Sequence, residues 1–468
     1  MKQVSPRILL LVLLGSIMMV FLLLIIPSKI TNGISVFSFP SENDFLPLEV
    51  EKVNTIYASV PLLTLLDVEE SHDYQKVQPK FNALPEDEKI IHSSDFTNDL
   101  ASFYFALNSL SSSDTLLRIL HFGDSQIEGD RVSGKLRQSF QNIFGGCGTG
   151  FMPISEHRVY RLNVLKQVSG WKRYKVFGSK PDGLHNRYGF LGYYHGMDTL
   201  KENSYIQIQK SKRYFSGVSR AEKFTVLYRA KSEYKGTDVS INNHKQSFGY
   251  EVKEGLVRSR SWYLDSFPNN SLSVQFKHQK DIEFYGISLD CKSGVALDNV
   301  GLRGSSGTEF TKIDEVTLRN QLQLLNANLI VYQFGVNVIP HIVDDYKFYE
   351  NMVYRQLKLF KKLAPNASIL VVGVSDMCQK NEGEFKSFPN IKKVILAQRN
   401  AALRAKCSFW DLQKVMGGEG SMKNWVNAKP PLGEKDYTHF NKRGANLVGE
   451  KLFSALMSDY YSHNELTQ

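Results

Sequence analysis

Three polar side chains in this sequence have the types needed for nucleophilic catalysis. Ser125 follows Gly123 and Asp124 in a short turn-like segment, and Asp436 and His439 lie three residues apart near the C-terminus. A serine hydroxyl is a poor nucleophile until a base removes its proton, and a histidine held by a carboxylate is such a base. We therefore predict that Ser125 is a nucleophile, His439 its general base and Asp436 the carboxylate that orients the imidazole.

Acyl transfer also needs hydrogen-bond donors for the negatively charged oxygen of its tetrahedral intermediate. The candidates are the backbone N–H groups of Ser125 and Gly304 and the side-chain amide of Asn337. Loss of one such donor typically lowers the rate about a hundredfold or more. A glycine at position 304 lets the backbone approach a substrate closely. We predict that these three residues form an oxyanion hole.

Each of these motifs is common when it is taken alone. Gly-Asp-Ser occurs in ordinary turns, and a second Asp-x-x-His is present at Asp182 and His185. We interpret that second pair as structural, because it lies in a segment of β-type alternation. The candidate catalytic and oxyanion residues are distinguished by their placement, since each of them is expected to follow a strand. In open α/β sheets the active site lies at the carboxyl ends of the strands.

Short apolar segments alternate with amphipathic segments along most of the chain. This alternation predicts a parallel β-sheet that is covered by helices on both faces. The expected strands are residues 116–122, 295–302, 329–334, 368–374 and 409–412, and the expected helices are 95–110, 132–144, 314–325, 391–406 and two that begin at 344 and 441.

Residues 151–290 have a different texture, with alternating runs such as SYIQIQ and KFTVLYRA. Such runs are typical of strands, so we expect an inserted all-β sandwich. The segment has 23 basic and 13 acidic residues and accounts for the whole net charge of +10. A local basic excess indicates either an anionic polymer as a neighbour or a solvated basic face, and it does not favour a nucleic-acid partner for the chain as a whole.

The N-terminus contains an unbroken run of 19 uncharged residues, Ile8–Ile26, which is long enough to span a bilayer. Lys2 and Arg7 precede it, so the N-terminus is expected in the cytoplasm and the remainder across the membrane. A cleaved signal peptide is the alternative, although no small-residue cleavage site follows. We expect residues 1–27 to be a membrane anchor and residues 28–94 a tether that holds the catalytic part in the periplasm or outside the cell.

Composition excludes several other classes of protein. A chain of 468 residues with 42% hydrophobic residues is long enough for two or three domains with real cores. Four cysteines are too few for a disulfide scaffold, and they leave the redox compartment open. The sequence has no phosphate-binding loop, dinucleotide fingerprint or cluster of metal ligands, so we expect neither a cofactor nor a metal ion.

Four segments resemble, in their order, the four blocks of the SGNH (GDSL-like) hydrolases. These segments are HFGDSQIEGD, NVGLRGSSG, QFGVN and DYTHFNKRG. The resemblance covers about residues 95–150 and 291–462, and it implies a flavodoxin-like three-layer α/β fold. The hydrolase domain would then comprise residues 95–150 and 291–468, with residues 151–290 inserted as a carbohydrate-binding-like β-sandwich.

The resemblance also implies roles for individual residues. It makes Ser125, Asp436 and His439 the catalytic triad and Ser125, Gly304 and Asn337 the oxyanion hole. The sequence departs from the usual pattern at Gln126, where GDSL enzymes have leucine, and at Val338, where an acidic residue often follows the asparagine.

The long insertion after the first block is similar to that of the peptidoglycan O-acetylesterases. The segment ILHFGDSQIEGDRVSGKLRQSFQNIFGGCGTGF also resembles their opening segment. This resemblance implies a serine esterase that removes O-acetyl groups from an envelope glycan, peptidoglycan or another polysaccharide, through an acetyl-serine intermediate.

Two other functions remain open from the sequence. An O-acetyltransferase would take acetyl from a membrane-bound O-acyltransferase partner and give it to a glycan, and an anchor near the donor would raise the effective concentration. A non-catalytic scaffold would bind glycan through the basic insert. The complete set of catalytic residues argues against the scaffold, because a binding protein does not need a nucleophile, a base and an orienting carboxylate together.

Overall fold

A computed structural model of the protein describes residues 84–467 except for short internal segments. The segments outside the description are 95–97, 157–160, 162, 178–181, 184, 212–216, 218–219, 231–236, 249–255, 265–270 and 278–280. The predicted anchor at Ile8–Ile26 and the predicted tether up to residue 83 also lie outside the described residues. Within the described residues, no helix combines the length and the apolar character needed to cross a membrane.

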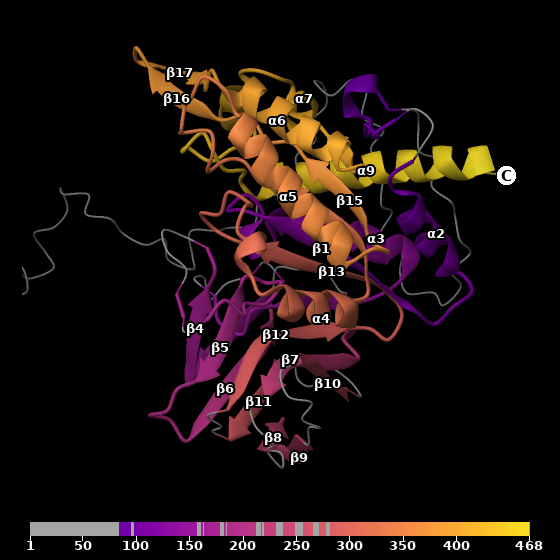
Figure 1. Cartoon of the computed structure of the whole chain (residues 1–468), viewed down its shortest axis with the longest axis vertical. Helices are drawn as coiled ribbons and strands as arrows, with labels where there is room; N and C mark the ends of the chain where they lie inside the picture. The colour runs from indigo at the N-terminus through magenta and orange to yellow at the C-terminus, as the bar shows by residue number, and fades with distance from the viewer. Residues whose placement is uncertain are drawn as a thin grey trace, which may run out of the picture. The chain divides into compact units, whose positions relative to one another are not determined.

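Five parallel strands form the central sheet (Figure 1). Their order is β13-β1-β14-β15-β18, which is 2-1-3-4-5 in chain order and is the order of flavodoxin-like sheets. The predicted parallel sheet is therefore confirmed. The strands are β1 (Leu116–Gly123), β13 (Gly294–Gly301), β14 (Ala327–Gln333), β15 (Ser368–Val372) and β18 (Ser408–Trp410).

Helices cover both faces of this sheet. The helices α2, α3 and α9 share a core with one face, and α4, α5 and α6 share a core with the other. The helices are α2 (Ala101–Ser109), α3 (Arg131–Phe144), α4 (Glu315–Leu325), α5 (Lys347–Leu363), α6 (Ile391–Arg404), α7 (Leu412–Met416), α8 (Ser421–Asn427) and α9 (Lys442–Thr467), with short 3-10 helices at Glu86–Glu88, Glu128–Asp130 and Phe310–Lys312.

The apolar strands separate the two cores because successive side chains of a strand point to opposite faces. In β14, Leu329 and Val331 pack with α2, α3 and α9, whereas Ile330 and Tyr332 pack with the helices of the opposite face. All four side chains are fully buried. A strand buried on both faces has no polar positions to alternate with, which explains why these segments are continuous apolar runs.

The segment predicted as an insert forms two antiparallel sheets. One has the order β10-β7-β12-β5-β4 with β2 also paired to β12, and the other has the order β3-β6-β11-β8-β9. The strands are β2 (Gly148–Met152), β3 (Val164–Ser169), β4 (Trp171–Lys175), β5 (Tyr193–Met197), β6 (Asn203–Lys210), β7 (Lys223–Ala230), β8 (Thr237–Ile241), β9 (His244–Phe248), β10 (Arg258–Tyr263), β11 (Ser271–Lys277) and β12 (Ile282–Asp290).

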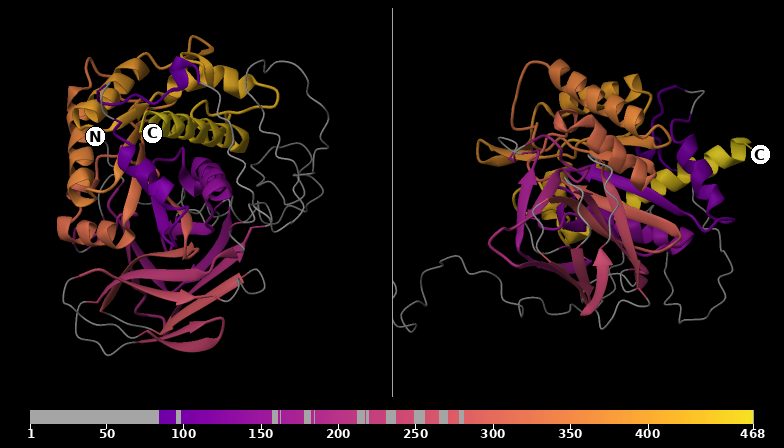
Figure 2. Two further views of the ribbon diagram at one scale, coloured as in Figure 1. Left: turned by 90° about the vertical axis from the view of Figure 1, so that its right-hand side faces the viewer. Right: turned by 60° about the horizontal axis from the view of Figure 1, so that its bottom comes forward.

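A separate apolar core joins these two sheets into a sandwich. Phe224 and Phe284 from one sheet pack in the same buried cluster as Ile206 and Val274 from the other. Figure 2 shows the strands of this insert gathered on one side of the parallel sheet and its helices. The expected β-sandwich is present, and it begins with β2 at Gly148, slightly before the predicted boundary at residue 151.

A disulfide closes the junction between the insert and the parallel sheet. Cys147 lies directly before β2, Cys291 lies directly after β12, and their Cα atoms are 5.1 Å apart. The bond therefore links the chain entering the insert to the chain leaving it. Cys378 and Cys407 are buried and free.

The residues before α2 pack on the sheet, although the tether was predicted to extend to residue 94. Ile91 forms an antiparallel bridge with Phe409 of β18, with both N–O distances 2.8 Å, and the Trp410 indole donates to the Glu88 carbonyl. This pairing covers the outer edge of β18, which would otherwise expose backbone hydrogen-bonding groups. The first predicted helix is shorter than expected, since α2 begins at Ala101.

Candidate active site

Ser125 lies in a tight turn at the carboxyl end of β1. The strand ends at Gly123, where an added Cβ atom would lie 2.7 Å from the Gln333 carbonyl oxygen and 2.8 Å from the Ile127 side chain. Only glycine allows β1 to pass so close to β14 at this point. Ser125 itself is 8% exposed, so most of the residue is covered by the surrounding chain.

The structure brings the three residues of the predicted triad together. Ser125 Oγ is 2.7 Å from His439 Nε2, and His439 Nδ1 is 2.7 Å from Asp436 Oδ2. An imidazole that donates from Nδ1 to the carboxylate is left with Nε2 free to accept the serine proton. This is the arrangement that activates a serine for attack on a carbonyl carbon.

The Asp436 carboxylate is held by its own loop. Its Oδ1 atom accepts hydrogen bonds from the backbone N–H groups of Thr438, at 3.0 Å, and His439, at 2.9 Å. Partial burial would raise the pKa of Asp436, but the hydrogen bonds from the His439 side chain and from these two N–H groups lower it to about 2. The carboxylate is therefore ionised at neutral pH and can stabilise an imidazolium.

The sequence suggested that the loop with Asp436 and His439 directly follows the last strand, and this was wrong. Two short helices, α7 and α8, lie between β18 and this loop. The loop is fixed instead by contacts within the folded chain. The N–H of Cys378 donates to the Tyr437 carbonyl at 3.0 Å, and the Tyr437 ring stacks on Phe385 with 3.6 Å between ring centroids. Phe385 belongs to a hairpin of β16 (Cys378–Asn381) and β17 (Glu384–Ser387).

Gln126 links the turn of Ser125 to the loop of His439. Its amide nitrogen donates to the Thr438 carbonyl at 2.7 Å and to Ser375 Oγ at 3.0 Å, and its amide oxygen accepts from the Phe440 N–H at 3.3 Å. The two loop contacts are on the residues on either side of His439. Gln126 is 2% exposed, so these bonds form away from solvent. The departure from leucine at this position therefore serves to hold the loop.

Asp124 stabilises the turn through hydrogen bonds to two backbone N–H groups. Its carboxylate accepts hydrogen bonds from the backbone N–H of Gln126 at 3.0 Å and of Gly335 at 3.2 Å. Gly335 follows β14, so the contact joins the ends of two neighbouring strands. Burial raises the pKa of Asp124 to about 6, although these hydrogen bonds act in the opposite direction.

The two other predicted oxyanion residues lie in adjacent loops at the strand ends. Asn337 Nδ2 donates to the carbonyl of Ser305, the residue after Gly304, at 2.9 Å. This bond uses one of the two N–H groups of the amide. Gly304 has φ +83°, a left-handed conformation that favours glycine, and an added Cβ would meet no protein atom within 4 Å. Within the protein, glycine is therefore required by the backbone conformation, whereas the sequence argument invoked close approach.

The second departure from the SGNH pattern has a packing explanation. Val338 is 7% exposed and belongs to the core that α4, α5 and α6 share with the sheet. An acidic side chain here would be buried in apolar surroundings, which is unfavourable unless the charge is paired.

The second Asp-x-x-His lies in the insert, and its two members have different partners. His185 Nε2 is 2.6 Å from Glu283 Oε1, and the Asp182 carboxylate accepts from the backbone N–H of Lys175. The pair thus makes structural contacts within the insert. In the part of the chain that the structure describes, no group of three or more His, Cys, Asp or Glu side chains is placed to hold a metal ion.

Sequence reasoning missed Asp124 and Gln126 as parts of the site. Both adjoin Ser125, and this adjacency was the available signal. Their partners, Gly335, Thr438 and Phe440, are more than 200 residues away in sequence. Only the folded chain shows those contacts.

The strand order and the position of the site at the strand ends fit the flavodoxin-like α/β fold that the resemblance to the SGNH hydrolases implied. Among solved structures, a peptidoglycan O-acetylesterase is similar over 79% of this chain and 99% of that chain, with a TM-score of 0.64 and 21% sequence identity. At this identity the similarity concerns the fold. It extends beyond the parallel sheet, because 79% of the chain is more than the hydrolase segments alone.

Two other solved structures match parts of this chain with low TM-scores. An acetyl xylan esterase matches 35% of this chain and 81% of that chain, with 18% identity and a TM-score of 0.28. A family two carbohydrate esterase from Clostridium thermocellum, solved in complex with cellohexaose, matches 61% of this chain and 98% of that chain, with 11% identity and a TM-score of 0.26. TM-scores this low do not establish a shared fold. No family model and no curated protein matches the sequence.

Proposed function

We propose that this protein is a serine esterase that removes O-acetyl groups from an envelope glycan, with peptidoglycan as the first candidate. The observation that carries the proposal is the hydrogen-bonded chain from Ser125 through His439 to Asp436, with 2.7 Å at both side-chain contacts. The fold shared with a solved peptidoglycan O-acetylesterase supports the choice of substrate.

The geometry supports a two-step reaction. Ser125 Oγ attacks the acetyl carbonyl carbon while its proton passes to His439 Nε2. The tetrahedral intermediate then collapses, the proton moves from His439 to the sugar oxygen, and the bond between that oxygen and the carbonyl carbon breaks. Acetyl-Ser125 remains. Water, deprotonated by His439, attacks this ester in the same way, so that acetate leaves and the serine hydroxyl is restored.

The negative charge of each intermediate would be stabilised by donors at the strand ends. These are the backbone N–H groups of Ser125 and Gly304 and the remaining amide N–H of Asn337. The bond from Asn337 to the Ser305 carbonyl holds the amide near the residue that follows Gly304, which supports a shared role for these two donors. Donors fixed before the reaction begins do not need to reorganise as charge develops.

We also propose that the catalytic part works outside the cytoplasm, held by an N-terminal anchor. The apolar run Ile8–Ile26 with Lys2 and Arg7 before it supports this orientation. The disulfide between Cys147 and Cys291 supports an oxidising compartment, since such bonds are rare in the cytosol. Protease added to spheroplasts should remove the catalytic part of the chain; complete protection, with the spheroplasts intact, would contradict this location.

The function is tested with the purified full-length protein and O-acetylated peptidoglycan. We expect the wild-type protein to release free acetate. In Ser125→Ala the rate of acetate release should fall at least a thousandfold, while the fold should be unchanged. Acetylated product formed on an added glycan in place of free acetate would identify a transferase. Glycan retention without acetate release and without labelling by a fluorophosphonate would identify a binding scaffold.

A further inference from the structure

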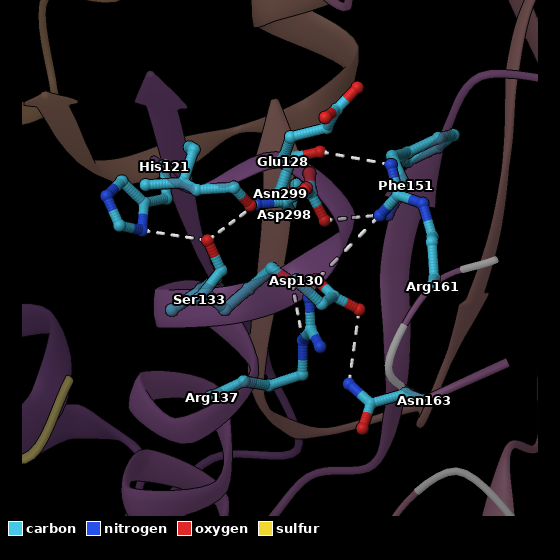
Figure 3. A network of polar contacts seen from close by, with 12 residues as sticks. His121, Glu128, Asp130, Ser133, Arg137, Phe151, Arg161, Asn163, Asp298 and Asn299 are labelled. Atoms are coloured by element: carbon cyan, nitrogen blue, oxygen red, sulfur yellow. Dashed lines mark hydrogen bonds and ion pairs between the residues drawn. The ribbon is translucent and has the colours of Figure 1, made fainter. Parts of the chain in front are cut away.

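We infer that Arg161 and Asn163 of the β-sandwich insert are positioning residues for the turn that carries Ser125. The inference rests on the proposed role of Ser125 as nucleophile, and it assigns the insert a part in catalysis besides any binding of glycan. The contacts that carry it lie between the insert and the residues that follow Ser125 (Figure 3).

The turn after Ser125 ends in a backbone conformation that needs support. Gly129 and Asp130 both have φ +71°, in the left-handed region. Glycine adopts this conformation readily, but for aspartate it is disfavoured and depends on surrounding contacts. Asp130 is fully buried and lies directly before α3, so its conformation sets how the turn joins the helix.

Side chains of the insert supply much of that support. Asn163 Nδ2 donates to Asp130 Oδ2 at 3.1 Å, and Arg161 Nη1 lies 3.8 Å from Asp130 Oδ1. Among the described residues, Arg137 of α3 is a further partner and donates to Asp130 Oδ1 at 2.9 Å. Figure 3 shows Asp130 between Arg137 and Asn163. Burial alone would raise the pKa of Asp130, but the charges of Arg137 and Arg161 lower it, so the carboxylate is ionised and holds its donors strongly.

A second set of contacts runs from Arg161 to the same turn through β13. Arg161 Nη2 donates to the Asn299 carbonyl at 3.4 Å, and Asn299 Nδ2 donates to the Ile127 carbonyl at 2.8 Å. Ile127 is two residues after Ser125. Arg161 is itself fixed by the Glu156 carboxylate, with distances of 2.8 and 3.0 Å. The insert therefore contacts the turn directly at Asp130 and reaches Ile127 indirectly, through Asn299 of β13.

The turn also contacts the predicted oxyanion loop. Arg303, the residue before Gly304, lies 3.5 Å from the Glu128 carboxylate. A shift at Asp130 would reach both the nucleophile and the backbone around Gly304, because Glu128 lies within the same short turn. Displacement of reacting groups by about 1 Å can lower a rate about a hundredfold.

This arrangement makes a specific prediction about a small ester that carries no glycan for the insert to bind. With p-nitrophenyl acetate at 25 °C, Asn163→Ala and Arg161→Gln should each lower kcat at least tenfold and change KM less than twofold. Arg161→Lys, which keeps the charge near Asp130, should recover part of the loss. The rate at which a fluorophosphonate labels Ser125 should also fall in these variants, and it should fall less in Arg161→Lys than in Arg161→Gln.

The matched control is Glu283→Gln, which breaks a buried ion pair elsewhere in the insert. Glu283 contacts His185 at 2.6 Å and Arg229 at 3.3 Å. This variant should lose thermal stability and keep kcat within twofold. The inference is overturned if Asn163→Ala and Arg161→Gln keep wild-type kcat and labelling rates, or if Glu283→Gln loses as much kcat as they do. Labelling needs no natural substrate, so failure of the proposed glycan esterase would be seen separately as absent acetate release.

Discussion

The amide nitrogen of Gln126 donates a 2.7 Å hydrogen bond to the carbonyl of Thr438. Gln126 directly follows the proposed nucleophile, and Thr438 directly precedes the proposed base. The bond therefore joins the two segments whose separation decides whether Ser125 Oγ and His439 Nε2 meet. Because Gln126 is buried, water does not compete for this contact.

Replacement of Gln126 by leucine, the residue usual in the GDSL pattern, should weaken catalysis. Leucine has a similar size but cannot bond to the Thr438 carbonyl or the Phe440 N–H, so the loop of His439 is less well fixed. We expect kcat/KM for p-nitrophenyl acetate to fall about ten- to a hundredfold. Gln126→Glu keeps an acceptor for the Phe440 N–H but loses the donor to the Thr438 carbonyl. Its kcat/KM should fall less than that of Gln126→Leu if the acceptor matters more than the donor. Wild-type kinetics in Gln126→Leu would show that the loop is held without this residue.

Substitution of Asp436 by asparagine should leave the fold intact and remove most of the activity. The asparagine amide can donate to His439 Nδ1 and so favour the tautomer that carries its proton on Nε2, which cannot accept the serine proton. We expect kcat to fall about a thousandfold or more, by analogy with other serine triads. The measurement is kcat with a small acetyl ester, beside a melting curve that should match the wild type. A loss of less than tenfold would mean that Asp436 does not orient the base.

The raised pKa of Asp124 predicts a pH dependence of stability. Its folded pKa of about 6 lies above the ordinary value of 3.8, so the folded state binds the proton more tightly than the unfolded state. The stabilisation from this group is complete below about pH 4 and is lost as the pH rises through 6, by roughly 3 kcal/mol in total. Asp124→Asn does not titrate there.

This dependence is measured by urea unfolding of the wild type and Asp124→Asn between pH 4 and 7. The free energy of unfolding of the wild type, relative to the variant, should decrease as the pH rises. A difference that is constant across this range would show that Asp124 titrates normally in the folded protein.

The disulfide at the junction between the insert and the parallel sheet should contribute to stability. Cys147 and Cys291 are 144 residues apart in sequence, and linking them restricts the unfolded chain. Replacing both by serine should lower the free energy of unfolding by about 2 to 4 kcal/mol. Dithiothreitol should reproduce the loss in the wild type and have no effect on the double variant. Equal unfolding curves with and without the reductant would contradict a stabilising disulfide.

The parallel sheet could be predicted from the sequence because its signal is local. Segments such as Leu116–Gly123 and Ala327–Gln333 are buried on both faces and therefore read as continuous apolar runs between amphipathic helices. The position of the insert was also visible, since its alternating strands have a different period. The boundary at residue 95 was placed too late, because the bridge between Ile91 and Phe409 leaves no periodic pattern in the sequence.

The site was predictable only in part. The types and order of Ser125, Asp436 and His439 indicated their meeting, and the 2.7 Å contacts agree with it. The contacts that fix these residues were not predictable. In the sequence, Gln126 is marked only by its departure from the usual leucine, and Asp130 looks like an ordinary turn residue. Their partners Thr438 and Asn163 belong to distant segments whose positions depend on the whole fold.

The central claim, a covalent acetyl-serine formed with the help of His439, is tested most directly by trapping the intermediate. The full-length protein is mixed with an acetyl ester, quenched in acid within milliseconds and analysed by peptide mass spectrometry. We predict one acetyl group on the peptide that contains Ser125, appearing faster than steady-state turnover or in step with it, and absent from Ser125→Ala and strongly reduced in His439→Ala. Continued acetate release by Ser125→Ala, or acetylation at another residue that accounts for turnover, would contradict the account.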